Sequence, residues 1–416
     1  MNIVRMDGFL SSIMAADSII GCRAVMHGPG GCRTHTSRLS ATRMLRDYEV
    51  REGPFYFNHP RVPCTYVDDE DYVNGADYKV TELLDTVNDA EVCVVIASPG
   101  TSLIGDDLNG AAYRSSFKGI TVIPEYCHMS EPAHAGYDST IADIVKSVCK
   151  KKPTRKGTAN ILGLPIILEG WETTVSEFKG YLEAMGIEVL ACVGAGCTVD
   201  ELKESSAAEF NVSIFKEYCA ETASEYEQFG IKTIFSETPI GFASTKSWIH
   251  NAAQFFGVNP TPALEILHAA EIRASRVLKA GLTEGFVARC ATFSVQVDSS
   301  LVLPLTKWLY GYLSMFPECI AVCDWWDTEY RKELDEFLAS IHCSDATSKP
   351  IESSRCDVLL SDGLTAKLFE KKGICSKGID VWLPSKHRMN FVDRPILGAK
   401  GAMRILDDIF YDIQRN

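Results

Sequence analysis

Apolar runs alternate with polar turns and helical stretches along most of the chain. Helices are predicted at 174–185, 301–315 and 364–372, and each lies between two apolar runs. Continuous apolar strands that alternate with helices are typical of parallel sheets covered on both faces. The pattern therefore predicts an α/β fold built from parallel sheets. The predicted strands lie at 90–97, 119–124, 160–168, 186–193, 286–295, 319–324, 356–360 and 378–383.

Charge and turn residues divide the chain into three parts. The segment 149–157 is basic and contains a proline, as expected of a solvated linker. A weaker boundary lies at Asn259-Pro-Thr-Pro262, where a helix should stop, and a long helical stretch follows it. We predict an N-terminal α/β domain at 1–155, a middle α/β domain at 156–262 and a C-terminal α/β domain at 263–416.

The charge balance argues against a nucleic-acid partner. The 416 residues include 55 acidic and 41 basic side chains, a net charge of −14, which would repel a polyanion over most of the surface. The apolar stretch 9–16 is flanked by Asp7 and Asp17 and lacks a basic leader. No apolar run approaches the roughly 20 residues that a membrane span needs. We expect a cytoplasmic protein that binds neither nucleic acid nor membrane.

Most of the fifteen cysteines lie inside apolar runs, but Cys32, Cys64 and Cys22 stand next to turn residues. Cys32 closes the turn His27-Gly-Pro-Gly-Gly-Cys32, in which backbone amides can approach whatever the sulfur binds. Cys64 follows a proline and Cys22 follows a glycine. Each could instead be a buried, reduced thiol. We predict Cys32, Cys64 and Cys22 as metal ligands, drawn from distant segments because the ferredoxin Cys-x-x-Cys spacing is absent.

Other motifs assign no catalytic residue. The chain has no Gly-x-x-x-x-Gly-Lys-Ser/Thr loop and no complete Gly-x-Gly-x-x-Gly after a strand, so we expect no nucleotide site. His27 is expected to fix the glycine turn by hydrogen bonds. Asp106 and Asp107 precede a predicted helix, and the positive end of a helix dipole stabilises carboxylates at this position.

The order of these motifs resembles the nitrogenase component 1 family, which includes nitrogenase subunits, their assembly scaffolds and the dark-operative protochlorophyllide reductase. The turn at 27–32 is followed in family order by 62–64, 70–75 and 104–108, and later by 198–202 and 393–402. The resemblance implies three Rossmann-like α/β domains with parallel sheets around a central cleft. It also implies an iron–sulfur cluster, of the 4Fe-4S type, held between two related subunits.

The chain departs from the family pattern at three positions. A family cysteine falls on Pro99, which cannot ligate iron. The earliest family cysteine of the β-type chains falls near Asp7; an aspartate serves as ligand in the protochlorophyllide enzyme, and Cys22 is the alternative. The cysteine that holds the nitrogenase cofactor is replaced by Phe215. The resemblance therefore implies no iron–molybdenum cofactor in this chain.

Three functions remain open at this point. The first is a subunit of a nitrogenase-like oxidoreductase that acts on a small-molecule substrate and receives low-potential electrons from a NifH-like, ATP-dependent iron–sulfur reductase. The second is a scaffold for assembly of a metal cofactor. The third is a non-catalytic partner subunit that binds no metal. In each case we expect a homodimer or a complex with a sister component 1 subunit.

Overall fold

The computed structural model of the chain describes residues 6–33, 62–119, 121–125, 131–283, 288–323, 328–382 and 392–412. Within these residues the strands form three sheets, with the orders β1-β2-β3, β5-β4-β6-β7 and β11-β10-β8-β9. Every pair of neighbouring strands in them is parallel. The predicted parallel α/β fold is confirmed. Each sheet falls within one of the three predicted domain ranges, whose exact bounds stay a prediction.

The first sheet carries helices on both faces. Alternate residues of β2 point to opposite sides: Val92, Val94 and Ile96 join the main core, whereas Cys93 and Val95 join a second core with residues of α4 and α5. Helices α1 and α6 pack against each other on the main-core side. The elements are α1 (Gly8–Asp17), β1 (Cys22–His27), α3 (Asp71–Asn74), α4 (Asp77–Thr86), β2 (Val92–Ala97), η2 (Thr101–Leu103), α5 (Leu108–Arg114), β3 (Thr121–Glu125) and α6 (Ala133–Val148).

The second sheet contains a shorter strand than the sequence predicts. The predicted strand 160–168 ends at Leu162, because Gly163 has a φ of 72° and its backbone lies against the carbonyl of Phe215. The apolar residues after Gly163 form a buried loop. The elements are β4 (Thr158–Leu162), α7 (Trp171–Ala184), β5 (Glu188–Cys192), α8 (Val199–Ser205), β6 (Phe210–Ser213), η3 (Lys216–Tyr218), α9 (Ala220–Gln228), β7 (Lys232–Ile234) and α10 (Gly241–Phe256).

The third sheet follows a long helix, α11. The predicted strands are present, but the first begins at Thr292, because residues 288–291 of the predicted range 286–295 form a turn in which Cys290 has a φ of 69°. Residues 286–287, 324 and 383 of the predicted ranges lie outside the described residues. The elements are α11 (Thr261–Thr283), β8 (Thr292–Val297), α12 (Ser299–Leu313), β9 (Phe316–Val322), α13 (Thr328–Ser340), η4 (Ser344–Thr347), η5 (Ile351–Ser353), β10 (Cys356–Asp362), α14 (Gly363–Lys371), β11 (Cys375–Trp382) and α15 (Gly398–Asp412).

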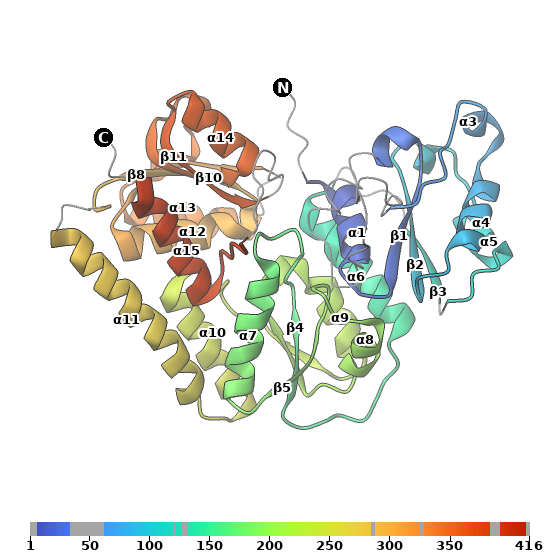
Figure 1. Cartoon of the computed structure of the whole chain (residues 1–416), viewed down its shortest axis with the longest axis horizontal. Helices are drawn as coiled ribbons and strands as arrows, with labels where there is room; N and C mark the ends of the chain where they lie inside the picture. The colour runs from blue at the N-terminus through green and yellow to red at the C-terminus, as the bar shows by residue number, and fades with distance from the viewer. Residues whose placement is uncertain are drawn as a thin grey trace.

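The last helix crosses from the third sheet to the second. Helix α15 packs against α7, α10 and α11, and residue Gly398 forms a bridge with Ile240 just before α10. Figure 1 shows the first sheet on the right, the second at the bottom and the third at the upper left, with α11 and α15 beside the middle helices. A helix predicted to belong to the C-terminal domain therefore completes the packing of the middle one.

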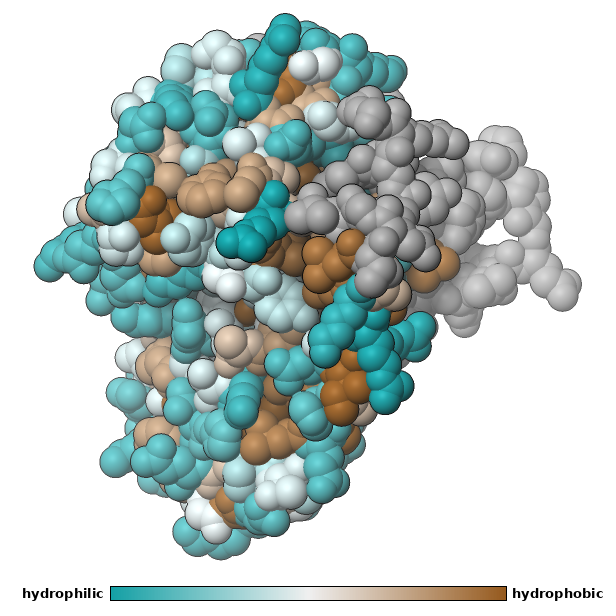
Figure 2. Space-filling view, turned by 90° about the vertical axis from the view of Figure 1, so that its left-hand side faces the viewer, coloured by the Kyte–Doolittle hydropathy of each residue, from teal (hydrophilic) through white to brown (hydrophobic). Residues whose placement is uncertain are grey.

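The surface next to α11 is mostly hydrophilic. Figure 2 shows this side of the molecule, where teal residues surround separate apolar patches. Helix α11 contributes exposed apolar side chains, among them Ile266, Val277 and Leu282. None of the helices that the structure describes has the length and apolar character needed to cross a bilayer.

Candidate functional site

Three chain segments meet where the strands of the first sheet end. Strand β1 runs directly into the glycine turn, and the segment 62–67 pairs with its end through the Met26 and Cys64 bridge. The amide of Met26 donates to the carbonyl of Pro63 at 2.8 Å, and the amide of Thr65 donates back to Met26 at 3.1 Å. The loop after β2 lies alongside, because the Ser98 amide donates to the His27 carbonyl at 2.8 Å. Ligands of open parallel sheets bind at this edge.

The glycine turn is confined by its neighbours at two positions. A Cβ on Gly28 would lie 2.6 Å from the Oγ of Ser98, and a Cβ on Gly30 would lie 2.9 Å from the ring of Tyr66. A Cβ on Gly31 would meet no atom within 4 Å. Close approach of backbone to side chain therefore explains Gly28 and Gly30, and it fixes the entry of the chain into Cys32.

Two of the three predicted thiols come together at this turn. Cys32 is half-buried and Cys64 is buried. The Cys64 thiol donates to the carbonyl of Gly28 at 3.1 Å, and the Tyr66 amide donates to its Sγ at 3.4 Å. Burial raises the pKa of Cys64 to about 11; the neighbouring Cys32 adds to this rise, whereas the charge of Arg33 opposes it. Burial also raises the pKa of Cys32.

Arg33 provides the positive charge beside these thiols. Its guanidinium lies over the ring of Tyr66, 5.4 Å from the centroid, and hydrogen-bonds the Tyr66 hydroxyl. Soft divalent metals replace the proton of a thiol on binding, and a nearby cation stabilises the thiolate that they need. The pair Cys32 and Cys64 is thus suited to hold part of a thiolate-ligated metal centre.

The third predicted thiol lies elsewhere. Cys22 begins β1 and His27 ends it, and five steps of a parallel strand separate them by about 16 Å. Burial raises the pKa of Cys22 well above its usual range, and the neighbouring Cys93 and Asp17 add to the rise. The structure therefore does not bring Cys22 to Cys32 and Cys64. Among the described residues, no three His, Cys, Asp or Glu side chains are grouped closely enough to hold a metal ion.

Asp7, unlike Cys22, lies at the same edge as the thiol pair. It caps α1, where its Oδ1 accepts a hydrogen bond from the Leu10 amide at 2.9 Å. It also forms a bridge with Pro132, directly before α6, which follows β3. Helix α1 packs against α6 and β1 (Figure 1), and the bridge to Pro132 puts its first turn beside the start of α6, at the carboxyl edge of the sheet. Burial raises the pKa of Asp7, against hydrogen bonds from backbone amides that lower it.

His27 is fully buried and bonds to two side chains. Its Nδ1 lies 3.0 Å from Thr65 Oγ1, and its Nε2 lies 2.8 Å from Asp106 Oδ2. The expected helix-capping role belongs to Asp107, whose Oδ1 accepts from the Gly110 amide at 2.9 Å at the start of α5. The sequence does not predict the contact of Thr65 with His27. The signal that pointed to Thr65 was its position directly after Cys64.

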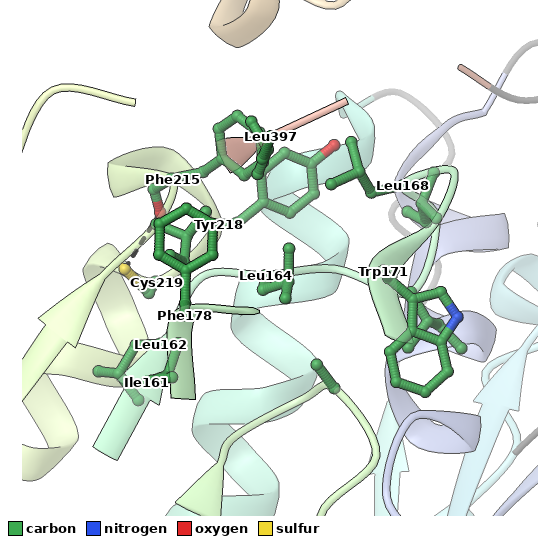
Figure 3. Packing of buried hydrophobic residues seen from close by; sticks show 14 of the residues in the cluster. Ile161, Leu162, Leu164, Leu168, Trp171, Phe178, Phe215, Tyr218, Cys219 and Leu397 are labelled. Carbon is green, nitrogen blue, oxygen red and sulfur yellow. Dashed lines mark hydrogen bonds between the residues drawn. The ribbon is translucent and has the colours of Figure 1, made fainter. Parts of the chain in front are cut away.

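The position of the nitrogenase cofactor cysteine is occupied by an apolar side chain. Phe215 is fully buried, and its ring lies 6.0 Å from that of Tyr218, measured between centroids. Figure 3 shows Phe215 beside Tyr218 and Leu397, with the Cys219 thiol donating to the Phe215 carbonyl. A phenyl ring offers no ligand atom, so this position does not fit a metal cofactor.

Comparisons with known proteins agree with the motif order. A sequence profile of the family described as nitrogenase component 1 type oxidoreductase matches residues 8–414. The B subunit of the light-independent protochlorophyllide reductase of Heliobacterium modesticaldum is 25% identical over 352 residues, which are 78% of this chain and 64% of that protein. The N subunit of the same enzyme from Rhodopseudomonas palustris is 23% identical over 360 residues, 84% of this chain and 80% of that protein.

The fold has a counterpart among solved structures. A structure described as nitrogenase Cp1 at pH 6.5 superposes with a TM-score of 0.76 at 16% identity, covering 99% of this chain and 94% of that one. The chain spans less than two thirds of the length of its relatives among the B subunits: 64% in Heliobacterium modesticaldum and 47% in Jannaschia sp..

Proposed function

The chain belongs to the family of nitrogenase component 1 type oxidoreductases, and on that premise we propose that it is a subunit of a nitrogenase-like reductase with an iron–sulfur cluster held partly by Cys32 and Cys64. The observation that carries the proposal is the adjacency of these two thiols at the carboxyl edge of the first sheet. The relatives that share the family are subunits of a reductase by name.

The surroundings of the thiols fit such a cluster. A cluster of the 4Fe-4S type would supply one-electron transfer at low potential. The Tyr66 amide already donates to Cys64 Sγ, and amide donors to sulfur are among the groups that tune such centres. Arg33 offsets part of the negative charge that two thiolates bring. Phe215 has no ligating atom, so no iron–molybdenum cofactor is part of the proposal.

The remaining ligands are proposed to come from elsewhere. Asp7 lies at the same edge and offers a carboxylate, as the family resemblance implies. Other ligands would come from a second copy of the chain or from a sister component 1 subunit. Large apolar side chains on the segments beside the thiols suit such a contact, since Tyr66, Val73 and Leu103 are 52%, 83% and 89% exposed. A second subunit that buries this surface would supply the missing ligands and shield the cluster from solvent.

Electrons are proposed to arrive from another protein. No phosphate-binding Gly-x-x-x-x-Gly-Lys-Ser/Thr loop occurs in the 416 residues. Low-potential reduction in this family is coupled to ATP, so a NifH-like iron–sulfur reductase would supply both the coupling and the electrons. The final acceptor would be a small-molecule substrate.

One observation favours a second candidate function. Pro99 stands where the family has a cysteine, and its ring carries no ligand atom. A chain that lost its ligands would act as a metal-free partner subunit, while one that kept only some would suit a scaffold for cofactor assembly.

Iron content separates the functions that bind a metal from the metal-free subunit. The protein is purified without oxygen together with any subunit that co-elutes, and iron and acid-labile sulfide are measured per chain. Cys32→Ala and Cys64→Ala should each lose most of the iron while the circular dichroism spectrum is unchanged, because each removes one ligand. Cys290→Ala, which changes an exposed thiol of the third unit, should keep it. Unchanged iron in Cys32→Ala would contradict the proposal, and a wild type without iron after reconstitution would support the metal-free subunit.

A further inference from the structure

A chain of hydrogen bonds runs through the buried region behind the thiol pair. The Gly28 amide donates to Thr65 Oγ1 at 3.0 Å, and the same hydroxyl oxygen lies 3.0 Å from His27 Nδ1. On the other side of the ring, Nε2 lies 2.8 Å from Asp106 Oδ2. The second carboxylate oxygen of Asp106 accepts from the Ala76 amide at 2.9 Å. Four segments that are distant in sequence are joined in this way.

With one proton on the His27 ring, every donor in this hydrogen-bond network faces an acceptor. A carboxylate accepts only, so the Asp106 side fixes a proton on His27 Nε2. In the neutral imidazole, Nδ1 then accepts from the Thr65 hydroxyl, whose oxygen is left to accept from the Gly28 amide. Each donor meets one acceptor, and His27 and Thr65 are both buried. This is the pattern by which outer groups orient the ligands of a metal site.

The side chains of His27, Thr65 and Asp106 join both thiol segments but bond to neither sulfur. Thr65 directly follows Cys64, and Gly28 begins the turn that leads to Cys32. The Gly28 carbonyl accepts from the Cys64 thiol and from the Val67 amide at 3.0 Å. Any shift of Thr65 relative to Gly28 therefore changes the distance between the two cysteine-bearing segments.

We propose that His27, Thr65 and Asp106 are positioning residues that hold the Cys64 segment against the glycine turn of Cys32. The inference rests on the proposed function, because the object positioned is the proposed pair of metal ligands. The role is distinct from catalysis, since none of the three side chains reaches a sulfur atom through the bonds described.

A matched set of threonine variants tests this role. Thr65→Val keeps the shape of the side chain but removes the hydroxyl shared by Gly28 and His27, whereas Thr65→Ser keeps the hydroxyl. Thr140→Val is the control: Thr140 is fully buried in α6 of the same unit, and its hydroxyl donates to the Gly136 carbonyl one turn earlier at 2.8 Å. His27→Ala would also remove a buried ring from the packing, so the threonine variants carry the test.

Two readouts are independent of enzyme activity. The first is iron affinity during anaerobic reconstitution at limiting iron, together with the electron paramagnetic resonance spectrum of the reduced protein. Thr65→Val should bind iron about 10- to 100-fold more weakly and show an altered spectrum, as expected when an outer partner of a ligand is lost. Thr65→Ser and Thr140→Val should match the wild type. The second is hydrogen exchange of the metal-free protein, which should be faster in peptides covering 26–28 and 64–67 only in Thr65→Val.

The outcomes separate this inference from the function on which it rests. If the wild type binds iron and Thr65→Val binds it equally well with the same spectrum, the positioning role is wrong while the proposed function stands. Equal losses of iron in Thr65→Val and Thr140→Val would also overturn it, because they would show general destabilisation. A wild type that binds no iron would overturn the proposed function and this inference together.

Discussion

Gly28 and Gly31 lie in the same turn, yet only Gly28 is confined by its surroundings. An alanine at Gly28 would bring its Cβ to 2.6 Å from Ser98 Oγ, whereas one at Gly31 meets nothing within 4 Å. We predict that Gly28→Ala lowers the melting temperature and the iron content, because the turn must move away from Ser98 and carries Cys32 with it. Overpacking of this kind costs typically about 1–3 kcal/mol.

The matched variant Gly31→Ala provides the control for this prediction. Its melting temperature, followed by differential scanning calorimetry, and its iron content should both equal those of the wild type. A Gly28→Ala protein with unchanged iron would show that the turn tolerates displacement.

The sequence carried part of the candidate site but not its arrangement. Cys32 and Cys64 could be predicted because glycine and proline mark turns whatever the tertiary structure. The failure of Cys22 to join them follows from strand direction, since Cys22 and His27 occupy opposite ends of β1. The bond between His27 and Asp106 spans 79 residues, and only a pairing of the strand ends in space reveals it.

At the scale of elements, one buried carboxylate fastens α15 to α7. Glu177 Oε1 accepts from the Ala399 amide at 2.7 Å and from the Tyr181 hydroxyl at 2.6 Å, while Oε2 accepts from the Lys400 amide at 3.2 Å. Burial raises the pKa of Glu177, and these hydrogen bonds oppose the rise. The Glu177 carboxylate thus caps the N-terminus of α15, a helix more than 200 residues later in the sequence.

We predict that Glu177→Ala destabilises the protein by about 1–3 kcal/mol, because it leaves buried amide donors at the start of α15 without their acceptor. Hydrogen exchange should increase first in 398–403. The control is Glu183→Ala on the same helix. The Glu183 side chain is exposed and forms a surface ion pair with Lys179, with 3.7 Å between Oε1 and Nζ. Surface pairs of this kind contribute about 0–1 kcal/mol. Equal effects of the two substitutions would contradict the fastening role.

The elements that the sequence predicted are those with long apolar runs. Strands β2 and β10 were found because nearly all of their residues are buried. Strand β1 was missed because Arg23 and His27 interrupt its apolar character, and β7 because it has only three residues. The sequence predicts a strand where the loop after β4 lies, because buried loops and buried strands have the same composition; the backbone turn at Gly163 distinguishes them.

At the scale of the whole molecule, the proposed transfer of electrons from a separate ATP-dependent reductase can be tested. We predict that the isolated chain hydrolyses no ATP, since its sequence contains no phosphate-binding loop. Substrate reduction should require a P-loop iron–sulfur reductase together with ATP. The rate of that encounter should fall with added salt if charge steers it, as the net charge of −14 allows.

Coupled assays of ATP hydrolysis and cluster reduction check this prediction. Hydrolysis by the chain alone, after removal of contaminating ATPases, would contradict it. Reduction of the cluster by the reductase without ATP would show that the nucleotide serves another step.

The path of α15 sets the order in which the chain matures during its synthesis. The faces of α7 and α10 that α15 covers are made early, but their cover is made only after the whole third sheet. Until residues 398–412 leave the ribosome, those apolar faces stay open to solvent and to other nascent chains. The packing of the middle unit is therefore completed only after the third sheet has been synthesised, although the middle unit is translated first.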